Sequence, residues 1–121
     1  MTSHVAIVAP HGGSIEAHTS SIARQVAGTD LNRYLFEGMR PAGNYQALHL
    51  TSHRFDEPRC LEMLSTCNQV VTIHGCGMKS RLLPGGLDEA LKKRLHDAFM
   101  DAGFESELTG RSFPAAEPGN I

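Results

Sequence analysis

The sequence predicts an α/β fold with a mostly parallel sheet, and three features carry this prediction. Residues 5–9 and residues 70–74 form two short runs that are apolar or β-branched almost throughout. Such runs are typical of strands buried on both faces inside a parallel sheet. The third feature is a long segment with helical spacing at residues 87–102. Strands that alternate with helices are typical of α/β domains with a parallel sheet.

The first predicted helix covers residues 21–27 and follows the first strand. Thr19 or Ser20 can supply the side-chain oxygen that caps this helix, and Gly28 can end it. Two further short strands are predicted from the runs at residues 34–36 and 46–50.

The second predicted helix covers residues 58–64 and precedes the strand at residues 70–74. Asp56 is placed to be its N-cap, and Pro58 suits the first helical turn because an N–H there has no partner within the helix. Gly75 closes the strand that follows.

The longest predicted helix, at residues 87–102, has one continuous apolar face. Asp88 and Glu89 lie at its start, where negative charge suits the helix dipole, and Gly103 can end it. Residues 104–108 are predicted to form a last strand. The apolar face consists of Leu87, Leu91, Leu95, Ala98, Phe99 and Ala102.

Length, charge and cysteine content restrict the location and partners that we expect. The 121 residues fit a single domain, residues 1–121. With 11 Lys and Arg against 13 Asp and Glu, the chain lacks the basic excess of a general nucleic-acid or acidic-lipid binder. Its longest apolar stretch, residues 5–10, is far too short to span a membrane, and the first four residues do not resemble a signal peptide. The three cysteines form no CxxC pair, so we expect reduced thiols in a cytoplasmic protein.

Both of the strongest predicted strands end in a histidine followed by glycine. His11 precedes Gly12, and His74 precedes Gly75. Ligands of open α/β sheets bind beyond the carboxyl ends of the strands, so adjacent parallel strands would bring both histidines to one edge. Glu16 lies in the loop after His11 and can fold back toward it. Two imidazoles, one carboxylate and one open position form a catalytic zinc site. Packed or hydrogen-bonded histidines are the alternative.

Several nearby residues have both a functional and a structural interpretation. Cys76 could be a fourth metal ligand or a thiol close to the site. His49 and His53 could line the cleft or support a ligand, or could be loop and packing residues. Lys79 and Arg81 could bind the carboxylates of a substrate, or could be solvated surface charges.

A longer pattern connects these residues. Residues 9–16 read Ala-Pro-His-Gly-Gly-Ser-Ile-Glu, and further characteristic stretches follow in order at residues 49–52, 55–58, 72–75 and 85–88. Together they resemble the zinc-dependent poly-gamma-glutamate hydrolase family, which includes phage enzymes and phage-related bacterial proteins. The resemblance extends over nearly the whole chain.

This resemblance implies a fold, a cofactor and a reaction. The implied fold is a three-layer α/β/α arrangement with a mostly parallel central sheet, similar to the zinc carboxypeptidases. The implied cofactor is Zn²⁺, with His11, Glu16 and His74 as its ligands. The implied reaction is hydrolysis of the γ-linked amide bonds of poly-gamma-glutamate. We therefore expect an anionic glutamate polymer or acidic peptide as the partner, and neither nucleic acid nor membrane.

The chain departs from the family pattern at two places. In the family, a glutamate on a later strand is the expected general base, and it would lie beyond Ile121. The sequence therefore indicates a domain truncated at its C-terminus and leaves the base unassigned, with Glu57 and Glu117 as candidate substitutes. At residues 17–18 this chain has Ala-His where the family pattern has Pro-Gly.

Three functions are compatible with these features. The first is a zinc-dependent hydrolase of γ-linked glutamyl amide bonds. The second is a zinc carboxypeptidase or amidase that acts on another acidic peptide. The third is a metal-binding remnant with an interaction role and no turnover, and the late glutamate is the feature that separates it from the two enzymes.

Overall fold

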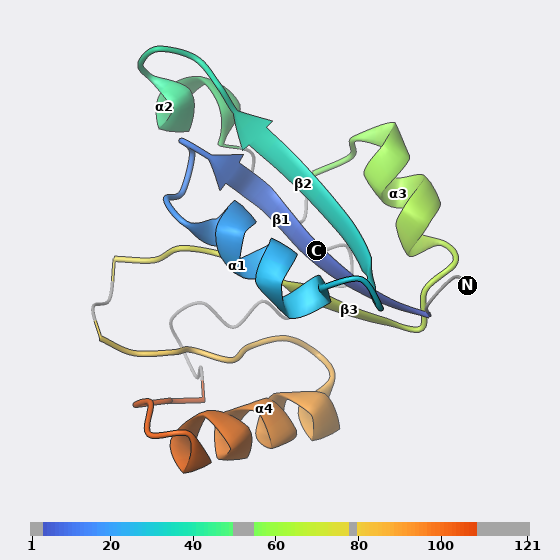
Figure 1. Ribbon diagram of the computed structural model, residues 1–121, viewed down its shortest axis with the longest axis vertical. Coiled ribbons are helices and arrows are strands. Elements are labelled where there is room, and N and C mark those ends of the chain that lie inside the picture. The colour runs from blue at the N-terminus through green and yellow to red at the C-terminus, as the bar shows by residue number, and fades with distance from the viewer. Residues whose placement is uncertain (1–3, 50–54, 78–79, 109–121) are drawn as a thin grey trace. The chain divides into compact units, whose positions relative to one another are not determined.

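The computed structural model describes residues 4–49, 55–77 and 80–108, which fall into two compact units divided between Gly75 and Cys76. The first unit contains a three-stranded sheet in the order β2-β1-β3 (Figure 1). Strand β1 (Val5–Gly13) pairs in parallel with both β2 (Asn32–Gly38) and β3 (Gln69–Thr72). This confirms the α/β fold with a mostly parallel sheet.

Strand β1 is the centre of the first unit because both of its faces are buried. On one face, Ala6 and Val8 pack with Phe55 and with Cys60 of α3 (Pro58–Leu64). On the other face, Ile7 and Ala9 pack with two alanines of α1 (Thr19–Ala27). Side chains of a strand alternate between its faces, so an unbroken apolar run gives two packing surfaces. This agrees with the interpretation of residues 5–9 as an interior strand.

The two helices of the first unit that were predicted are both present, but their caps differ from the prediction. Helix α1 begins at Thr19, so Thr19 and Ser20 are its first residues and not its cap. The N-cap of α3 is Glu57 and not Asp56, since the Glu57 side chain accepts a hydrogen bond from the Cys60 N–H. A cap is defined by which oxygen reaches the free N–H groups, and neighbouring polar residues compete for this role.

The predicted strand at residues 46–50 is wrong over its described part. Residues 44–48 form a short helix, α2 (Asn44–Leu48), and Leu50 lies outside the described residues. A five-residue helix has almost no intrinsic stability, so tertiary contacts decide its conformation. The buried Asn44 side chain supplies such contacts, because it accepts from Arg40 N at 2.9 Å and donates to Arg40 O at 2.8 Å.

The second unit is built around α4 (Glu89–Asp101). Asp88 caps this helix by accepting from the Leu91 N–H, and Gly103 follows its end with a φ of +91°, so both predicted boundary residues are confirmed. The predicted strand at residues 104–108 is reduced to one isolated parallel bridge between Leu82 and Ser106. The carboxyl end of the chain, from residue 109, lies outside the described residues.

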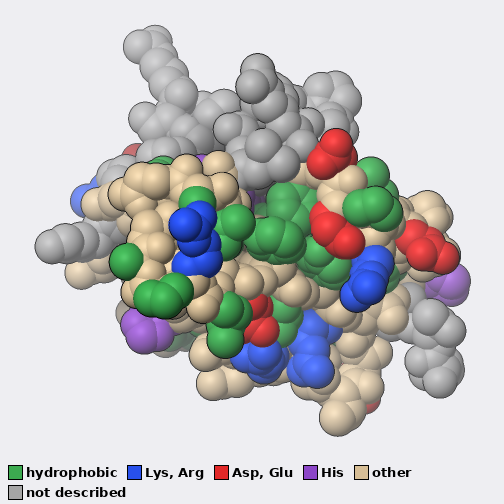
Figure 2. Space-filling model, turned by 90° about the horizontal axis from the view of Figure 1, so that it is seen from above, with side chains coloured by type: hydrophobic (Ala, Val, Ile, Leu, Met, Phe, Trp, Pro, Cys, Tyr) green, Lys and Arg blue, Asp and Glu red, His purple; other side chains and the backbone are tan. Residues whose placement is uncertain are grey.

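The sequence raises expectations for the hydropathy of the helices and for the distribution of charged side chains. No helix among the described residues is long and apolar enough to cross a membrane. On the face shown in Figure 2, the described basic and acidic side chains are interspersed with apolar ones.

Candidate metal centre

His11 lies at an irregularity of strand β1. The pairing of β1 with β2 shifts between Ala9 and Gly12, where three steps along β1 match two along β2. Pro10 lies in this interval and has no N–H to donate to a neighbouring strand, which suits it to such a bulge. Bulges turn side chains away from the regular alternation of the strand. The His11 side chain is 3% exposed, which places its ring inside the unit.

Glu16 is brought back to His11 by a hydrogen-bonded loop. The Glu16 N–H donates to His11 O at 2.8 Å, and the Thr19 hydroxyl donates to Glu16 O at 2.9 Å. At the other side of the loop, the Gly13 N–H donates to the Ser20 hydroxyl at 3.0 Å. The first residues of α1 therefore hold the loop through their side chains.

His74 reaches the same place from the adjacent strand. The Ile73 N–H donates to Val8 O at 2.8 Å, so the pairing with β1 continues beyond the end of β3. The next residues are His74 and Gly75, and the Gly75 N–H donates to Glu16 Oε1 at 3.0 Å. A Cβ added to Gly75 would lie 3.3 Å from the Glu16 Cβ, so the absence of a side chain allows this close approach.

Three donor atoms converge at this edge of the sheet. His11 Nδ1 lies 3.1 Å from Glu16 Oε1 and 3.2 Å from His74 Nδ1, and His74 Nδ1 lies 3.5 Å from Glu16 Oε1. The predicted placement of both histidines at one carboxyl edge of the sheet is confirmed. In a tetrahedral zinc site with bonds of about 2.0–2.1 Å, ligand atoms lie about 3.3–3.4 Å apart. The three distances therefore fit a zinc ion.

His49 is a fourth member of the cluster. Its Nε2 atom lies 3.4 Å from Glu16 Oε2, and its ring stacks on His11 with centroids 4.1 Å apart. Donor atoms of His11, Glu16 and His49 all lie within 4.8 Å of one another. The sequence left His49 between a supporting and a packing role, because 33 residues separate it from Glu16 and no spacing rule connects them.

The environment of Glu16 stabilises its charged form. Burial on its own would raise the Glu16 pKa, but the hydrogen bonds from His11, His74 and the Gly75 N–H together lower it by more than burial raises it. The net pKa lies well below that of an ordinary glutamate, so Glu16 is a carboxylate at neutral pH. An ionised carboxylate beside two imidazoles is the donor set that a divalent cation such as zinc prefers.

The other candidate residues either lie outside the described residues or are not members of this cluster of donor atoms. Lys79, His53 and Glu117 lie outside the described residues. Arg81 belongs to the second unit and forms an exposed ion pair with Glu107 at 2.7 Å. Cys76 is exposed and forms no disulfide.

Glu57 is engaged in local structure. Its Oε2 atom accepts from the Tyr34 hydroxyl at 2.6 Å and from the Cys60 N–H at 2.9 Å. These two bonds give Glu57 a structural explanation as the cap of α3.

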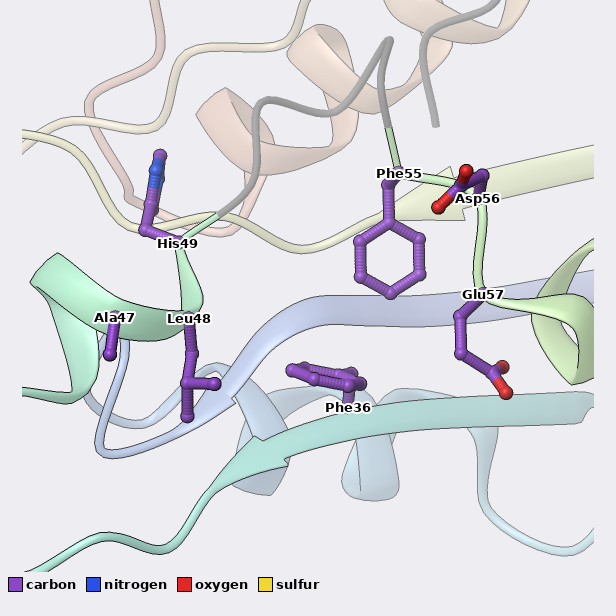
Figure 3. A pocket seen from close by; sticks show the side chains of 7 residues that line it. All are labelled: Phe36, Ala47, Leu48, His49, Phe55, Asp56 and Glu57. Atoms are coloured by element: carbon purple, nitrogen blue, oxygen red, sulfur yellow. The ribbon is translucent and has the colours of Figure 1, made fainter.

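A hollow of about 400 Å³ lies beside the cluster. In Figure 3 the His49 side chain stands at its rim and points away from Leu48 and Phe36. Asp56 and Glu57 contribute carboxylates to the wall, which disfavours an anionic ligand in this hollow. The lining residues are Phe36, Ala47, Leu48, His49, Phe55, Asp56 and Glu57.

The sequence model of the poly-gamma-glutamate hydrolases matches residues 1–121, the whole of this chain. The chain belongs to the poly-gamma-glutamate hydrolase family. This is a hydrolase family, and the family prediction from residues 9–16 and the later stretches is confirmed.

The chain is also similar to individual proteins of Bacillus subtilis. The SPbeta prophage-derived protein YoqZ of Bacillus subtilis (strain 168) is 43% identical over 105 residues, which are 86% of this chain and 38% of YoqZ. Protein YndL of the same strain is 38% identical over 122 residues, which are 98% of this chain and 48% of YndL. The chain therefore spans less than half the length of these two relatives.

Two solved structures have the same fold. A zinc-free apo form of YndL matches with a TM-score of 0.89 at 38% identity, over 98% of this chain and 59% of that one. A bacteriophage poly-gamma-glutamate hydrolase matches with a TM-score of 0.91 at 32% identity, over 99% of this chain and 58% of the phage chain.

Proposed function

We propose that this chain carries the zinc site of a hydrolase that cleaves γ-linked glutamyl amide bonds. The observation that carries this proposal is the convergence of His11 Nδ1, Glu16 Oε1 and His74 Nδ1 at 3.1–3.5 Å. Membership of a poly-gamma-glutamate hydrolase family supports the substrate. The related YndL structure is a zinc-free apo form, which supports zinc as the metal.

Each residue of the cluster has a defined part in this proposal. His11 and His74 would hold the ion through their Nδ1 atoms, and Glu16 would hold it through Oε1. The Gly75 N–H keeps the Glu16 carboxylate in place, because it donates to Oε1 at 3.0 Å. At this place a zinc ion would supply a Lewis acid for the scissile carbonyl.

Hydrolysis of an amide also needs a group that moves a proton to the leaving nitrogen. Among the described residues, the group that could hold a metal contains one carboxylate, Glu16. The proposal uses Glu16 as a metal ligand, so the proton must be moved by another group. We propose that the proton-transferring carboxylate belongs to the part of the relatives that this chain does not match.

Three further proposals concern the complete fold, the contacts with the substrate and the location of the protein. We infer that the complete fold is a three-layer, carboxypeptidase-like arrangement with residues 1–121 in one domain, supported by the packing of β1 against α1 and α3. Lys79 and Arg81 are proposed to bind the carboxylates of the polymer, because cationic side chains suit this ligand. A cytoplasmic location stays a prediction.

The test is fragment release from poly-γ-glutamate, with poly-α-glutamate as the comparison polymer. The zinc-loaded chain is assayed alone and as a chimera that continues into the C-terminal part of the bacteriophage hydrolase. We expect the chimera to cleave the γ-linked polymer and the chain alone to be about 10²–10⁴-fold slower, the usual loss when a general base is missing. Glu16→Gln in the chimera should abolish cleavage.

The outcomes separate the three functions predicted from the sequence. Cleavage of the α-linked polymer in place of the γ-linked one would indicate a peptidase acting on another acidic peptide. Zinc binding without cleavage of either polymer by the chimera would indicate a metal-binding remnant. Full activity of the chain alone would contradict the proposed source of the proton-transferring carboxylate.

A further inference from the structure

The candidate metal centre is backed by a column of three aromatic rings. The Tyr45 ring stacks on His49 with centroids 4.4 Å apart, and His49 stacks on His11 with centroids 4.1 Å apart. Both pairs have an interplanar angle of 29°. His49 is therefore held on both ring faces, which leaves the edge of its ring to contact other groups.

The polar edge of His49 faces the carboxylate of Glu16. Nε2 of His49 lies 3.4 Å from Oε2, whereas His11 and His74 contact the other oxygen, Oε1. The two oxygens of Glu16 thus have different partners. The His49 side chain is 25% exposed and that of Glu16 is 12% exposed, so water screens this contact only in part.

The orientation of its ring distinguishes His49 from His74 as a possible partner of His11 in holding the ion. The lone pair of an imidazole nitrogen lies in the plane of the ring. The lone pairs of two rings that stack nearly parallel therefore lie in neighbouring planes and do not point to one common atom. His11 and His49 are stacked in this way. The His11 and His74 rings are tilted by 55°, and their Nδ1 atoms face each other at 3.2 Å. This tilted pair suits a shared ion better than the stacked pair does.

The backbone that carries His49 is locked independently of the cluster. His49 is the residue after α2, and its N–H donates to Tyr45 O at 3.1 Å. The buried Asn44 holds the first turn of α2 through its two hydrogen bonds to Arg40. These bonds fix the backbone at His49, and the stacking against Tyr45 orients its ring without any metal.

We propose that His49 is a positioning residue that binds Oε2 of Glu16 and so presents Oε1 to the metal. The proposal rests on the proposed function, because it matters only if Glu16 is a metal ligand. Partners that orient metal ligands typically contribute 10–100-fold to metal affinity. His49 acts through Glu16 and not by contact with the ion.

The test is zinc affinity, measured by competition with a chromophoric chelator, for the wild-type chain and three variants. His49→Ala removes the ring and the N–H, and His49→Phe keeps a stacking ring without the N–H. Both should lower the zinc affinity about 10–100-fold. His49→Gln keeps an N–H group that can reach Oε2, so its loss should stay below about 10-fold. His4→Ala is the control, because His4 is exposed and precedes the opposite end of β1.

A second measurement distinguishes a positioning residue from a ligand. The visible spectrum of bound Co²⁺ depends on the identity and geometry of its ligands. We expect His49→Gln to leave this spectrum unchanged and His74→Ala to alter it. A changed spectrum in His49→Gln would overturn the proposal and assign His49 as a ligand.

The remaining outcomes separate this inference from the proposed function. Equal zinc affinity in His49→Ala and wild type would overturn the role of His49 and leave the metal site intact. A similar loss in His49→Gln and His49→Ala would also overturn it, since the restored N–H would then have no effect. No zinc binding by the wild-type chain would overturn both proposals.

Discussion

At the scale of single residues, His18 shows a conflict between side chain and backbone. Its φ is +70°, in the left-handed region that favours glycine, and the resemblance described above leads us to expect glycine at this position. A non-glycine residue in this region carries about 1–2 kcal/mol of strain. The structure thus gives a physical reason for a glycine at this position of the loop that holds Glu16.

We expect His18→Gly to stabilise the protein by about 0.5–1 kcal/mol, the strain released minus the extra entropy of an unfolded glycine. Urea unfolding measures this difference. Ala17→Gly is the matched control, because φ of Ala17 is not positive and the added glycine should destabilise by about 0.5–1 kcal/mol. Destabilisation by both variants would contradict the strain at His18.

Cys60 and Cys76 should differ in reactivity. Burial raises the pKa of the Cys60 thiol to about 11, and the negative charge of Glu57 adds to this effect. At pH 8 only about one Cys60 in a thousand is then a thiolate, the form that reacts. We expect iodoacetamide to alkylate the exposed Cys76 in the native protein and Cys60 only after unfolding, as mass spectrometry would show.

Equal alkylation of Cys60 and Cys76 in the native state would contradict the burial of Cys60. The same experiment tests the other interpretation of Cys76. Protection of Cys76 by added zinc would indicate that it is a fourth ligand.

At the scale of elements, the N-terminus of α3 depends on Glu57. Hydrogen bonds from the Tyr34 hydroxyl and the Cys60 N–H help to lower the Glu57 pKa below its ordinary value of 4.5. A carboxyl whose pKa is lowered in the folded state stabilises that state above its unfolded pKa. This stabilisation is lost as the pH falls through the folded-state pKa.

Glu57→Gln should therefore lower the thermal midpoint at pH 7 and have a smaller effect at pH 3, where the wild-type carboxyl takes up protons on unfolding. Calorimetry at the two pH values measures this change. Glu62→Gln removes an exposed carboxyl from the same helix and should show no comparable difference. An equal effect of Glu57→Gln at both pH values would contradict the charged cap.

The elements also show what local sequence can and cannot predict. The strand at residues 5–9 was predictable because an apolar, β-branched run defines a buried strand without reference to the rest of the chain. Helix α2 was not predictable in this way, since five residues cannot form a stable helix alone. Its conformation depends on the bonds of Asn44 to Arg40, which lies outside the helix.

At the scale of the whole molecule, three residues of the candidate site could be predicted from the sequence and a fourth could not. His11 and His74 could be placed together because each lies at the carboxyl end of a strong strand, and the ends of parallel strands meet at one edge. Glu16 followed from its closeness in sequence to His11. The contact of His49 with Glu16 could not be predicted, because it depends on the packing of a helix that the sequence favours as a strand.

Zinc should stabilise the folded chain, because the three donors meet only after β1 and β3 have paired. At a free zinc concentration 100 times the dissociation constant, the added stability is about 2.7 kcal/mol. Thermal unfolding with zinc and with a chelator measures this difference. Zinc should give no shift in His11→Ala, and an unchanged shift there would contradict a site that includes His11.

The central claim is that His11, Glu16 and His74 hold one zinc ion, and metal content tests it most directly. The chain is loaded with zinc, passed through gel filtration and analysed by mass spectrometry for zinc per mole of protein. We expect about one zinc per chain in the wild type and in His4→Ala, and almost none in His11→Ala, Glu16→Ala or His74→Ala. Full zinc content in the double variant His11→Ala, His74→Ala, or none in the wild type, would contradict the account.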